Sequence, residues 1–339
     1  MPVKAYVDIK NIIYNAKQIK KRLPEGVKFC AVVKADAYGH GAEKVSDAVY
    51  NIVDCFAVAT VAEGVKLRLC GTDKDILVLT KVFNDELVRA ADYSLTLTAS
   101  DVSDLKRYAA EGARRGVPVK VHIKYDTGMN RQGVKGERAL KAALSFCKKS
   151  KGLDLCGLYS HFARPEDDKS RKAALDKFSV ARKLVKEYNN GITCHISASG
   201  GFLKGEYADM VRIGILLYGY KPFDTDAIKV KPAMKVYAPI VMRRTLKRGD
   251  QALYGNKRAT KETDFALIRY GYADGLFRKE IKGQFNNRCM DLTAATGVSK
   301  TARRVAVMEN ADVLAGEYGT IPYEILVKCT LRAEKIYVY

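Results

Sequence analysis

The sequence predicts an α/β protein, a (β/α)8 TIM-type barrel followed by a mostly β C-terminal domain. Short β-branched apolar runs alternate with longer amphipathic stretches eight times through the first two thirds of the chain. After Tyr220 this alternation stops, and strand-like runs broken by glycines and charged turns replace it. Eight alternations favour a parallel barrel over an open doubly wound sheet.

Each predicted barrel strand is a short apolar run. The eight runs are Phe29–Val33, Cys55–Ala59, Ile76–Leu79, Ser94–Thr98, Val119–Ile123, Leu155–Tyr159, Thr193–Ile196 and Met210–Ile213. Two of the intervening stretches, DVSDLKRYAAEGARRG and RKAALDKFSVARKLVKEY, carry apolar residues at helical spacing. We therefore expect helices between the strands, each with one buried face.

The last third of the chain is expected to form a separate β domain. Its strand-like stretches include AMKVYAPIVMRRT, DFALIRYGYADG, RRVAVM and EILVKCTLRAEKIYVY, which show little helical periodicity. We place the barrel at residues 9–225 and the β domain at residues 226–339, with an N-terminal strand over residues 1–8 joined to the β domain.

The composition indicates a cytoplasmic globular protein. No apolar run approaches the ~20 residues of a membrane helix, and the polar N-terminus lacks a signal-peptide core. The eight cysteines are scattered without a CxxC pair, which argues against a metal site and a disulfide framework. The net charge of +21 is spread along helix-like stretches, so we expect a basic surface and no nucleic-acid partner. Attraction of anionic small molecules is the alternative.

Polar residues follow the predicted strands, where barrel enzymes keep their catalytic groups. Lys34 comes directly after four apolar residues in CAVVKADAYGHG. An amine at that place must be neutral or paired, which suits a Schiff base with an aldehyde cofactor. A lysine that reaches from the strand end into solvent is the alternative. Similar positions after later strands hold Lys124, Arg131, His161, Ser199 and Gly214, and Arg212 lies on the eighth strand itself. The glycines among these segments would let backbone N–H groups approach an anion such as a phosphate.

Eight motifs, in order, resemble the alanine racemase family over nearly the whole chain. They are VVKADAYGHG, KYDTGMNRQG, GLYSHF, SASGG, MVRIGILLYG, LYG, YGYADG and CMD. The resemblance implies an enzyme that uses pyridoxal 5'-phosphate (PLP) to interconvert L- and D-alanine, which supplies D-alanine for cell-wall peptidoglycan. It also implies a homodimer with shared active sites and a small amino acid as the substrate.

The resemblance implies two catalytic bases on opposite faces of the substrate. Lys34 matches the lysine that holds PLP and acts as one base, and Tyr254 matches the second base, which the partner subunit supplies. Opposed bases let either enantiomer lose its proton to one base and regain it from the other. Because a phenol has a pKa of about 10, Tyr254 would need nearby cations to act near pH 7.

The resemblance also assigns the groups around the cofactor. Arg212 matches the arginine that faces the pyridine nitrogen, with His161 as its neighbour. A cation there disfavours protonation of that nitrogen, which weakens the ring as an electron sink and favours racemisation over transamination. The positions that match phosphate contacts are Tyr38, Ser199, Gly214 and Ile215.

Further matches concern the substrate and its path into the site. Arg131 and Met290 match the residues that bind the substrate carboxylate. Lys124 matches a lysine that the family often carries as a carbamate, which would give Arg131 an anionic partner; Asp126 is the alternative partner. Tyr272 and Asp274 match positions at the entrance that the dimer forms.

The sequence departs from the family pattern in three places. Leu331 stands where most members have a tyrosine near the cofactor phosphate and the entrance, eight residues past Tyr323. Ala198 replaces a usual asparagine, and the stretch LTAATGVSKTARR after CMD is atypical. These departures leave a serine or broad-specificity racemase as an alternative.

Two other classes of PLP protein share this barrel. A non-catalytic PLP-carrier protein would lack the β domain and Tyr254, and a PLP decarboxylase would place an acid where Arg212 stands.

Overall fold

The computed structural model describes residues 2–251, 253–254, 258–275, 277–278 and 285–339. By their contacts these residues form two compact units. The barrel unit comprises Ile12–Ala37 and Ala42–Lys231, and the β unit comprises Met1–Asn11, Tyr38–Gly41 and Pro232–Tyr339. The four residues Tyr38–Gly41 belong to the β unit by their contacts, although the residues before and after them in the sequence belong to the barrel unit.

The barrel unit is built on eight parallel strands in the order β8-β7-β6-β5-β4-β3-β2-β9. The strands are β2 Lys28–Val32, β3 Cys55–Val58, β4 Ile76–Val78, β5 Thr96–Ala99, β6 Val119–Lys124, β7 Leu153–Tyr159, β8 Thr193–His195 and β9 Met210–Ile213. A parallel bridge between Ala198 and Arg212 brings the ends of the sheet together, and the Arg212 N–H donates to Ser197 O over 3.0 Å. The predicted (β/α)8 barrel is confirmed, and every predicted strand lies within two residues of an observed one.

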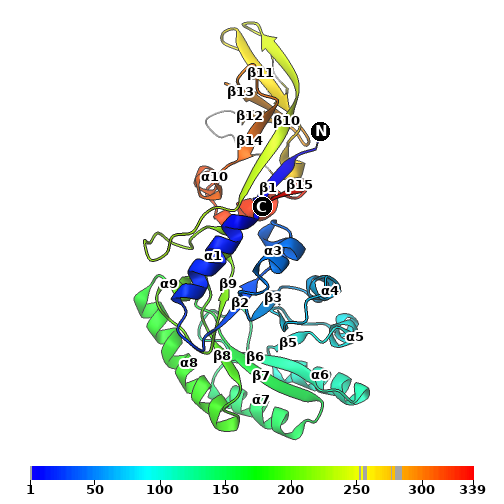
Figure 1. Cartoon of the computed structure of the whole chain (residues 1–339), viewed down its shortest axis with the longest axis vertical. Coiled ribbons are helices and arrows are strands. Elements are labelled where there is room, and N and C mark those ends of the chain that lie inside the picture. Colours follow the sequence, from blue (N-terminus) through cyan, green and yellow to red (C-terminus); the bar gives the residue numbers. More distant parts are fainter. Residues whose placement is uncertain (1, 252, 255–257, 276, 279–284) are drawn as a thin grey trace. The chain divides into compact units, whose positions relative to one another are not determined.

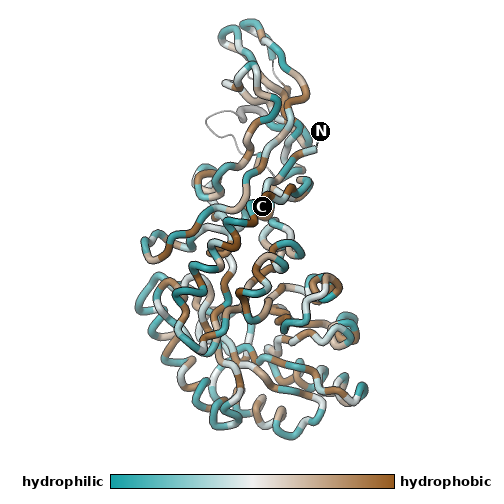
Figure 2. The backbone as a smooth tube through the Cα atoms, viewed as in Figure 1, coloured by the Kyte–Doolittle hydropathy of each residue, from teal (hydrophilic) through white to brown (hydrophobic). Residues whose placement is uncertain are grey.

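Helices cover the outside of these strands (Figure 1). They are α1 Ile9–Arg22, α3 Ala42–Val49, α4 Val61–Leu69, α5 Asn84–Asp92, α6 Val102–Arg115, α7 Glu137–Lys149 and α8 Asp168–Tyr188. Polar and apolar residues alternate along them, as Figure 2 shows. In α6, for example, Leu105 and Tyr108 are buried while Lys106 is exposed, so one face of the helix packs on the sheet.

The interior of the barrel carries polar side chains. On β6, Val121 and Ile123 alternate with His122 and Lys124, so the two pairs face opposite sides of the sheet. His122 contacts a histidine of β8, and Lys124 lies over a tyrosine ring of β7. His122 and Lys124 therefore face the barrel interior, where bulky aliphatic side chains are usual in this fold.

The β unit contains one seven-stranded sheet. Its order is β12-β13-β11-β10-β1-β15, and β14 also pairs with β10. The strands are β1 Lys4–Asp8, β10 Met234–Leu246, β11 Thr263–Ile268, β12 Phe285–Arg288, β13 Thr293–Thr296, β14 Arg304–Met308 and β15 Glu334–Val338. The long strand β10 pairs with β1 and β14 through its first half and with β11 through its second half.

One sequence expectation in this unit is wrong. The stretch that begins at Glu324 is not a strand, because Pro322–Lys328 forms helix α11 and only Glu334–Val338 is extended. Pro322 occupies the first helical turn, where its missing N–H is not needed, and Glu324 pairs with Lys328 one turn later at 2.6 Å. A second helix, α10, spans Ala311–Tyr318.

No helix within the described residues is both long enough and apolar enough to span a bilayer.

Candidate active site

Lys34 begins a left-handed turn directly after strand β2. The turn spans Lys34–Tyr38, and Ala35, Asp36, Ala37 and Tyr38 all have φ between 51° and 56°. Each L-residue in this conformation costs roughly 1–2 kcal/mol relative to the right-handed one. Four in succession therefore store roughly 4–8 kcal/mol of local strain, which the surrounding contacts must offset.

Glu63 supplies a side-chain contact that helps to hold this turn. Its Oε1 accepts a hydrogen bond from the Ala35 N–H at 2.7 Å. Its Oε2 accepts from the N–H groups of Ala59 at 2.7 Å and Thr60 at 3.2 Å. Glu63 is also the third residue of helix α4 and forms a capping box with Thr60. One carboxylate thus ties the turn after β2 to the end of β3 and the start of α4.

The Lys34 amine is partly buried among other cations. Burial, followed by the charge of Arg131, lowers the pKa of Lys34, and Glu63 opposes that shift. Lys124 is 5% exposed, with its amine 4.8 Å from the ring centre of Tyr159. Burial, with the charges of Arg212 and Arg131, lowers the pKa of Lys124 to about 7. Both amines are therefore brought toward the neutral form, in which an amine is a nucleophile.

Arg212 lies on strand β9 and is 3% exposed. Its Nη2 donates to Ser160 O at 2.7 Å and to Ile196 O at 3.1 Å. Its Nη1 donates to the ring nitrogen Nδ1 of His195 at 2.5 Å. Burial lowers the pKa of Arg212 to about 10, so the guanidinium stays charged at neutral pH. Among the described residues, no carboxylate forms an ion pair with it.

His161 contacts this cation, and the predicted phosphate residues of the barrel unit lie at the ends of strands β8 and β9. His161 Nδ1 lies 3.3 Å from Arg212 Nη2, and burial together with the charge of Arg212 lowers the pKa of His161 well below its usual value. Ser199 begins the short helix α9, Ser199–Leu203, and its Oγ accepts from the Gly214 N–H at 3.3 Å. Gly214 immediately precedes Ile215, the first residue of the 3-10 turn Ile215–Tyr218. Ser199, which follows β8, therefore contacts Gly214, which follows β9 and precedes Ile215.

Arg131 and Asp126 occupy the loop after β6. Arg131 is exposed, and its charge lowers the pKa values of Lys34, Lys124 and His161. Asp126 Oδ1 accepts from the N–H groups of Gly128 at 2.9 Å and Asn130 at 3.1 Å. That carboxylate therefore helps to shape the loop.

Tyr38 ends the left-handed turn and packs within the β unit. Its ring lies 5.9 Å from the ring of Tyr323, and burial raises the pKa of Tyr38. The next residue, Gly39, has φ 81°, and a Cβ there would lie 2.3 Å from Thr330 Oγ1. Only glycine therefore allows this close approach to the end of α11.

The residues predicted to lie at the entrance, Tyr272, Asp274 and Leu331, belong to turns of the β unit. Tyr272–Asp274 forms a 3-10 turn in which the Asp274 carboxylate accepts from the Gly271 N–H at 2.9 Å. Arg332, next to the exposed Leu331, lies 3.7 Å from Asp274. Tyr272 is 39% exposed.

Met290 and Tyr254 present exposed side chains in the β unit. Met290 O accepts from the Ala273 N–H at 3.0 Å, and no described residue accepts a hydrogen bond from the Met290 N–H. Tyr254 is 77% exposed, and residues 255–257 beside it lie outside the described residues.

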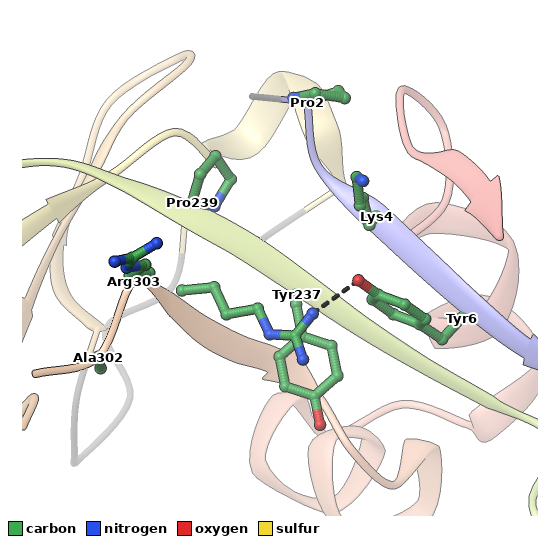
Figure 3. Close-up of a pocket in the computed structure, with 8 residues that line it drawn as sticks. Pro2, Lys4, Tyr6, Tyr237, Pro239, Ala302 and Arg303 are labelled. Carbon is green, nitrogen blue, oxygen red and sulfur yellow. Dashed lines mark hydrogen bonds between the residues drawn. The ribbon is translucent and has the colours of Figure 1, made fainter.

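A separate pocket of about 570 Å³ lies in the β unit (Figure 3). Its lining includes Lys4, Tyr6, Tyr237 and Arg304, and the Arg304 guanidinium donates to Tyr6 OH at 2.6 Å. It contains none of the predicted site residues.

Sequence reasoning missed three residues of the barrel unit. Glu63 could have been found from the pattern Thr60-x-x-Glu63, which marks a capping box. His122 and His195 are two of only four histidines in the chain, and both stand on inward positions of strands. Their pairing depends on the strand register and is not visible in the sequence.

Comparison with known proteins assigns the family. Residues 7–222 match the alanine racemase N-terminal domain, and residues 233–337 match the alanine racemase C-terminal domain. The chain belongs to the alanine racemase family. "Alanine racemase 2" of Caldanaerobacter subterraneus subsp. tengcongensis is 32% identical over 370 residues, covering 100% of this chain and 95% of the relative. "Alanine racemase 1" of Bacillus subtilis is 32% identical over 362 residues, covering 98% of this chain and 92% of the relative.

Solved structures of the alanine racemase family share the fold. The alanine racemase of Clostridium difficile 630 matches with a TM-score of 0.93 at 28% identity and covers 100% of this chain and 96% of that chain. The Bacillus anthracis enzyme, solved with bound L-Ala-P, matches with a TM-score of 0.93 at 26% identity, covering 100% and 95%. These relatives are all described as alanine racemases, so the serine racemase and carrier-protein alternatives are not favoured.

The contacts of Glu63 predict a selective effect on the strained turn. Glu63→Ala leaves the Ala35 N–H without its side-chain acceptor and should lower the free energy of unfolding by about 2–3 kcal/mol, the scale of a hydrogen bond to a charged group. PLP affinity should fall as well, because Lys34 starts the released turn. Denaturant unfolding and PLP titration measure the two effects.

Thr60→Ala is the matched control. It removes the other half of the same capping box, at about 1 kcal/mol, but keeps the acceptor of the Ala35 N–H. An equal loss of PLP affinity in both variants would contradict the proposed contribution of Glu63.

The lowered pKa of Lys124 predicts a pH-dependent stability. Between pH 7 and pH 10 the unfolded chain binds a proton at Lys124 that the folded chain lacks, so stability rises with pH by up to about 1.4 kcal/mol per pH unit. Lys124→Met should remove this slope in cofactor-free protein unfolded in CO₂-free buffer at pH 7, 8 and 9. Lys120→Met is the control, since the pKa of Lys120 is raised by Asp75 and it does not titrate in this range. Equal slopes for Lys124→Met and the wild type would show that Lys124 is charged in the folded state.

Proposed function

We propose that Lys34 and Tyr254 are the two bases of a PLP-dependent alanine racemase that is complete only as a homodimer. The chain catalyses the interconversion of L- and D-alanine with PLP, as its full-length relatives are described to do. The observation that carries the assignment of Lys34 is its place at the end of β2, where a strained turn holds a partly buried amine whose pKa is lowered.

The charge distribution of the barrel unit fits PLP. The charge of Arg131 contributes to the lowered pKa values of Lys34, Lys124 and Arg212, and the charge of Arg212 also lowers the pKa of Lys124. PLP carries an anionic phosphate and the substrate carries a carboxylate, so both would relieve this repulsion. Ser199 and the N–H groups of Gly214 and Ile215 would hold the phosphate, together with Tyr38. When bound, PLP would supply the electron sink that stabilises the deprotonated α-carbon.

Arg212 and the residues near the cofactor site each have a role in binding the cofactor or the substrate. Arg212 stays charged at neutral pH, so it would face the pyridine nitrogen of bound PLP and would disfavour a second positive charge there. His161 accepts from Arg212 through Nδ1 and steadies it. Arg131 binds the substrate carboxylate, helped by the Met290 N–H, and a carbamate on Lys124 orients Arg131.

The homodimer follows from the second base. A two-base racemisation needs a proton acceptor on the face of the substrate opposite Lys34. We assign this role to Tyr254 of the partner, with Tyr272, Asp274 and Leu331 at the entrance. The exposure of Tyr254 in the single chain supports this assignment. Leu331 cannot donate to the phosphate, so the entrance is more apolar than in most of the family. We further propose that the protein works in the cytoplasm and that residues 9–225, and 226–339 with 1–8, are its domains.

Mixing two inactive variants tests the shared site. Lys34→Ala lacks the residue that binds PLP covalently, and Tyr254→Phe should lose at least ~10²-fold in activity, more from L-alanine than from D-alanine. Heterodimers of the two variants contain one intact site and should recover part of the activity. Borohydride reduction of the wild type should also label Lys34 alone.

Failure to recover activity in mixtures shown to contain heterodimers would exclude Tyr254 as a base supplied by the partner. A label on another lysine would exclude Lys34. The two results are independent of each other.

A further inference from the structure

Two consecutive hydrogen bonds connect Arg212 to His195 and His195 to His122 in the barrel interior. Arg212 Nη1 lies 2.5 Å from His195 Nδ1, and His195 Nε2 lies 3.0 Å from His122 Nδ1. The three side chains come from β9, β8 and β6. His195 is fully buried and His122 is 8% exposed. These two histidines have no role in the function assigned above.

The chemistry of the guanidinium determines which atom donates in each of these two hydrogen bonds. A guanidinium can only donate, so His195 Nδ1 must be the unprotonated acceptor. Burial lowers the pKa of His122 to about 3 and that of His195 well below its usual value, so both rings are neutral. The one proton of His195 is then on Nε2 and is donated to His122 Nδ1. His122 in turn carries its proton on its own Nε2.

The barrel is shaped to admit the His122 ring. A Cβ at Gly157 on the neighbouring strand β7 would lie 2.3–2.4 Å from three atoms of that ring. The other side of His195 is fixed as well, because the Tyr159 ring stacks on it with centroids 5.0 Å apart and an interplanar angle of 5°. Tyr159 is held in turn by Thr98, with the two hydroxyl oxygens 2.9 Å apart.

We propose that His122 is a positioning residue for racemisation: it holds His195 in the Nε2–H tautomer, the form that can accept from Arg212. Gly157 provides the space in which His122 does this. With the other tautomer, His195 would present an N–H to the Arg212 N–H, and the guanidinium would lose its neutral acceptor. The link to racemisation rests on the role of Arg212 proposed above, whereas the tautomer of His195 does not.

The remaining histidines provide internal references. His161 Nδ1 also faces Arg212, so His161 should carry its proton on Nε2. His40 Nδ1 lies 3.1 Å from the carbonyl oxygen of Tyr38, which can only accept, so neutral His40 should carry its proton on Nδ1. The chain contains four histidines in all, so one ¹⁵N spectrum can resolve each of them.

The direct test is ¹⁵N-histidine NMR of the full chain without PLP, with resonances assigned by single His→Gln variants. In the wild type, His195 should show a protonated Nε2 and a bare Nδ1, opposite to His40. In His122→Leu the His195 signals should change to a mixture of tautomers, and His122→Gln should restore the wild-type pattern because the Gln oxygen can accept from Nε2–H. Gly157→Ala should reproduce the His122→Leu pattern although it removes no polar atom.

Activity with L-alanine provides the second readout. His122→Leu should lower kcat by ~10-fold or more, the usual scale for residues that orient a catalytic group, with little change in KM. His122→Gln should recover most of this loss. Val121→Ala is the control for a purely structural effect, since Val121 is a buried neighbour on β6 that faces the opposite side of the sheet. It should lower stability and leave kcat and the His195 spectrum unchanged.

A wild-type His195 protonated on Nδ1, or a His195 spectrum that does not respond to His122→Leu, would overturn the proposal. So would a loss of kcat in Val121→Ala equal to that in His122→Leu. If the wild type showed the predicted tautomers but no racemase activity, the function would be wrong and the tautomer assignment would stand.

Discussion

The burial of the Arg212 cation without an acidic partner is the constraint on which the site depends. A guanidinium removed from water must place its N–H groups on acceptors, or the buried charge destabilises the fold by several kcal/mol. Here the acceptors are neutral and include the carbonyl groups of Ser160 and Ile196 and the imidazoles of His195 and His161. A carboxylate would have satisfied the same groups and cancelled the charge. Neutral acceptors keep the charge available to the interior of the barrel.

The uncancelled charge affects the groups around it. It contributes to the lowered pKa values of Lys124, His161 and His195, although burial is the larger cause for each. The site without ligand therefore holds positive charge that disfavours any further cation and favours an anion. Binding of an anionic cofactor should then stabilise the fold by mass action as well as by contact. The left-handed turn after Lys34 is strained as well, and the hydrogen bond from the Ala35 N–H to Glu63 and the close packing of Gly39 help to hold it.

The sequence was sufficient to predict the barrel and the polar residues at most strand ends, because strands alternate with helices at a spacing that leaves little choice of topology. Lys34 and Lys124 stand where the rule that catalytic groups lie at the ends of barrel strands would place them, whereas Arg212 lies within β9. The left-handed turn could not be foreseen, because Ala35–Tyr38 are residues whose local preference is for other conformations. The pairing of His122 with His195 depends on the register between strands and on the missing side chain at Gly157. Helix α11 was mistaken for a strand because its seven residues are too few to show a helical period.

The most direct test of the central claim is the ratio of pyruvate formed to alanine racemised when Arg212 is replaced. Arg212→Glu puts a group that can share a proton where the fixed cation stood, and we expect the ratio to rise by ~10-fold or more as transamination competes with racemisation. Arg212→Lys keeps a cation and should leave the ratio near that of the wild type. Because the measurement is a ratio of two products, it does not depend on how much of each variant folds. An unchanged ratio in Arg212→Glu would show that the buried charge does not direct the reaction.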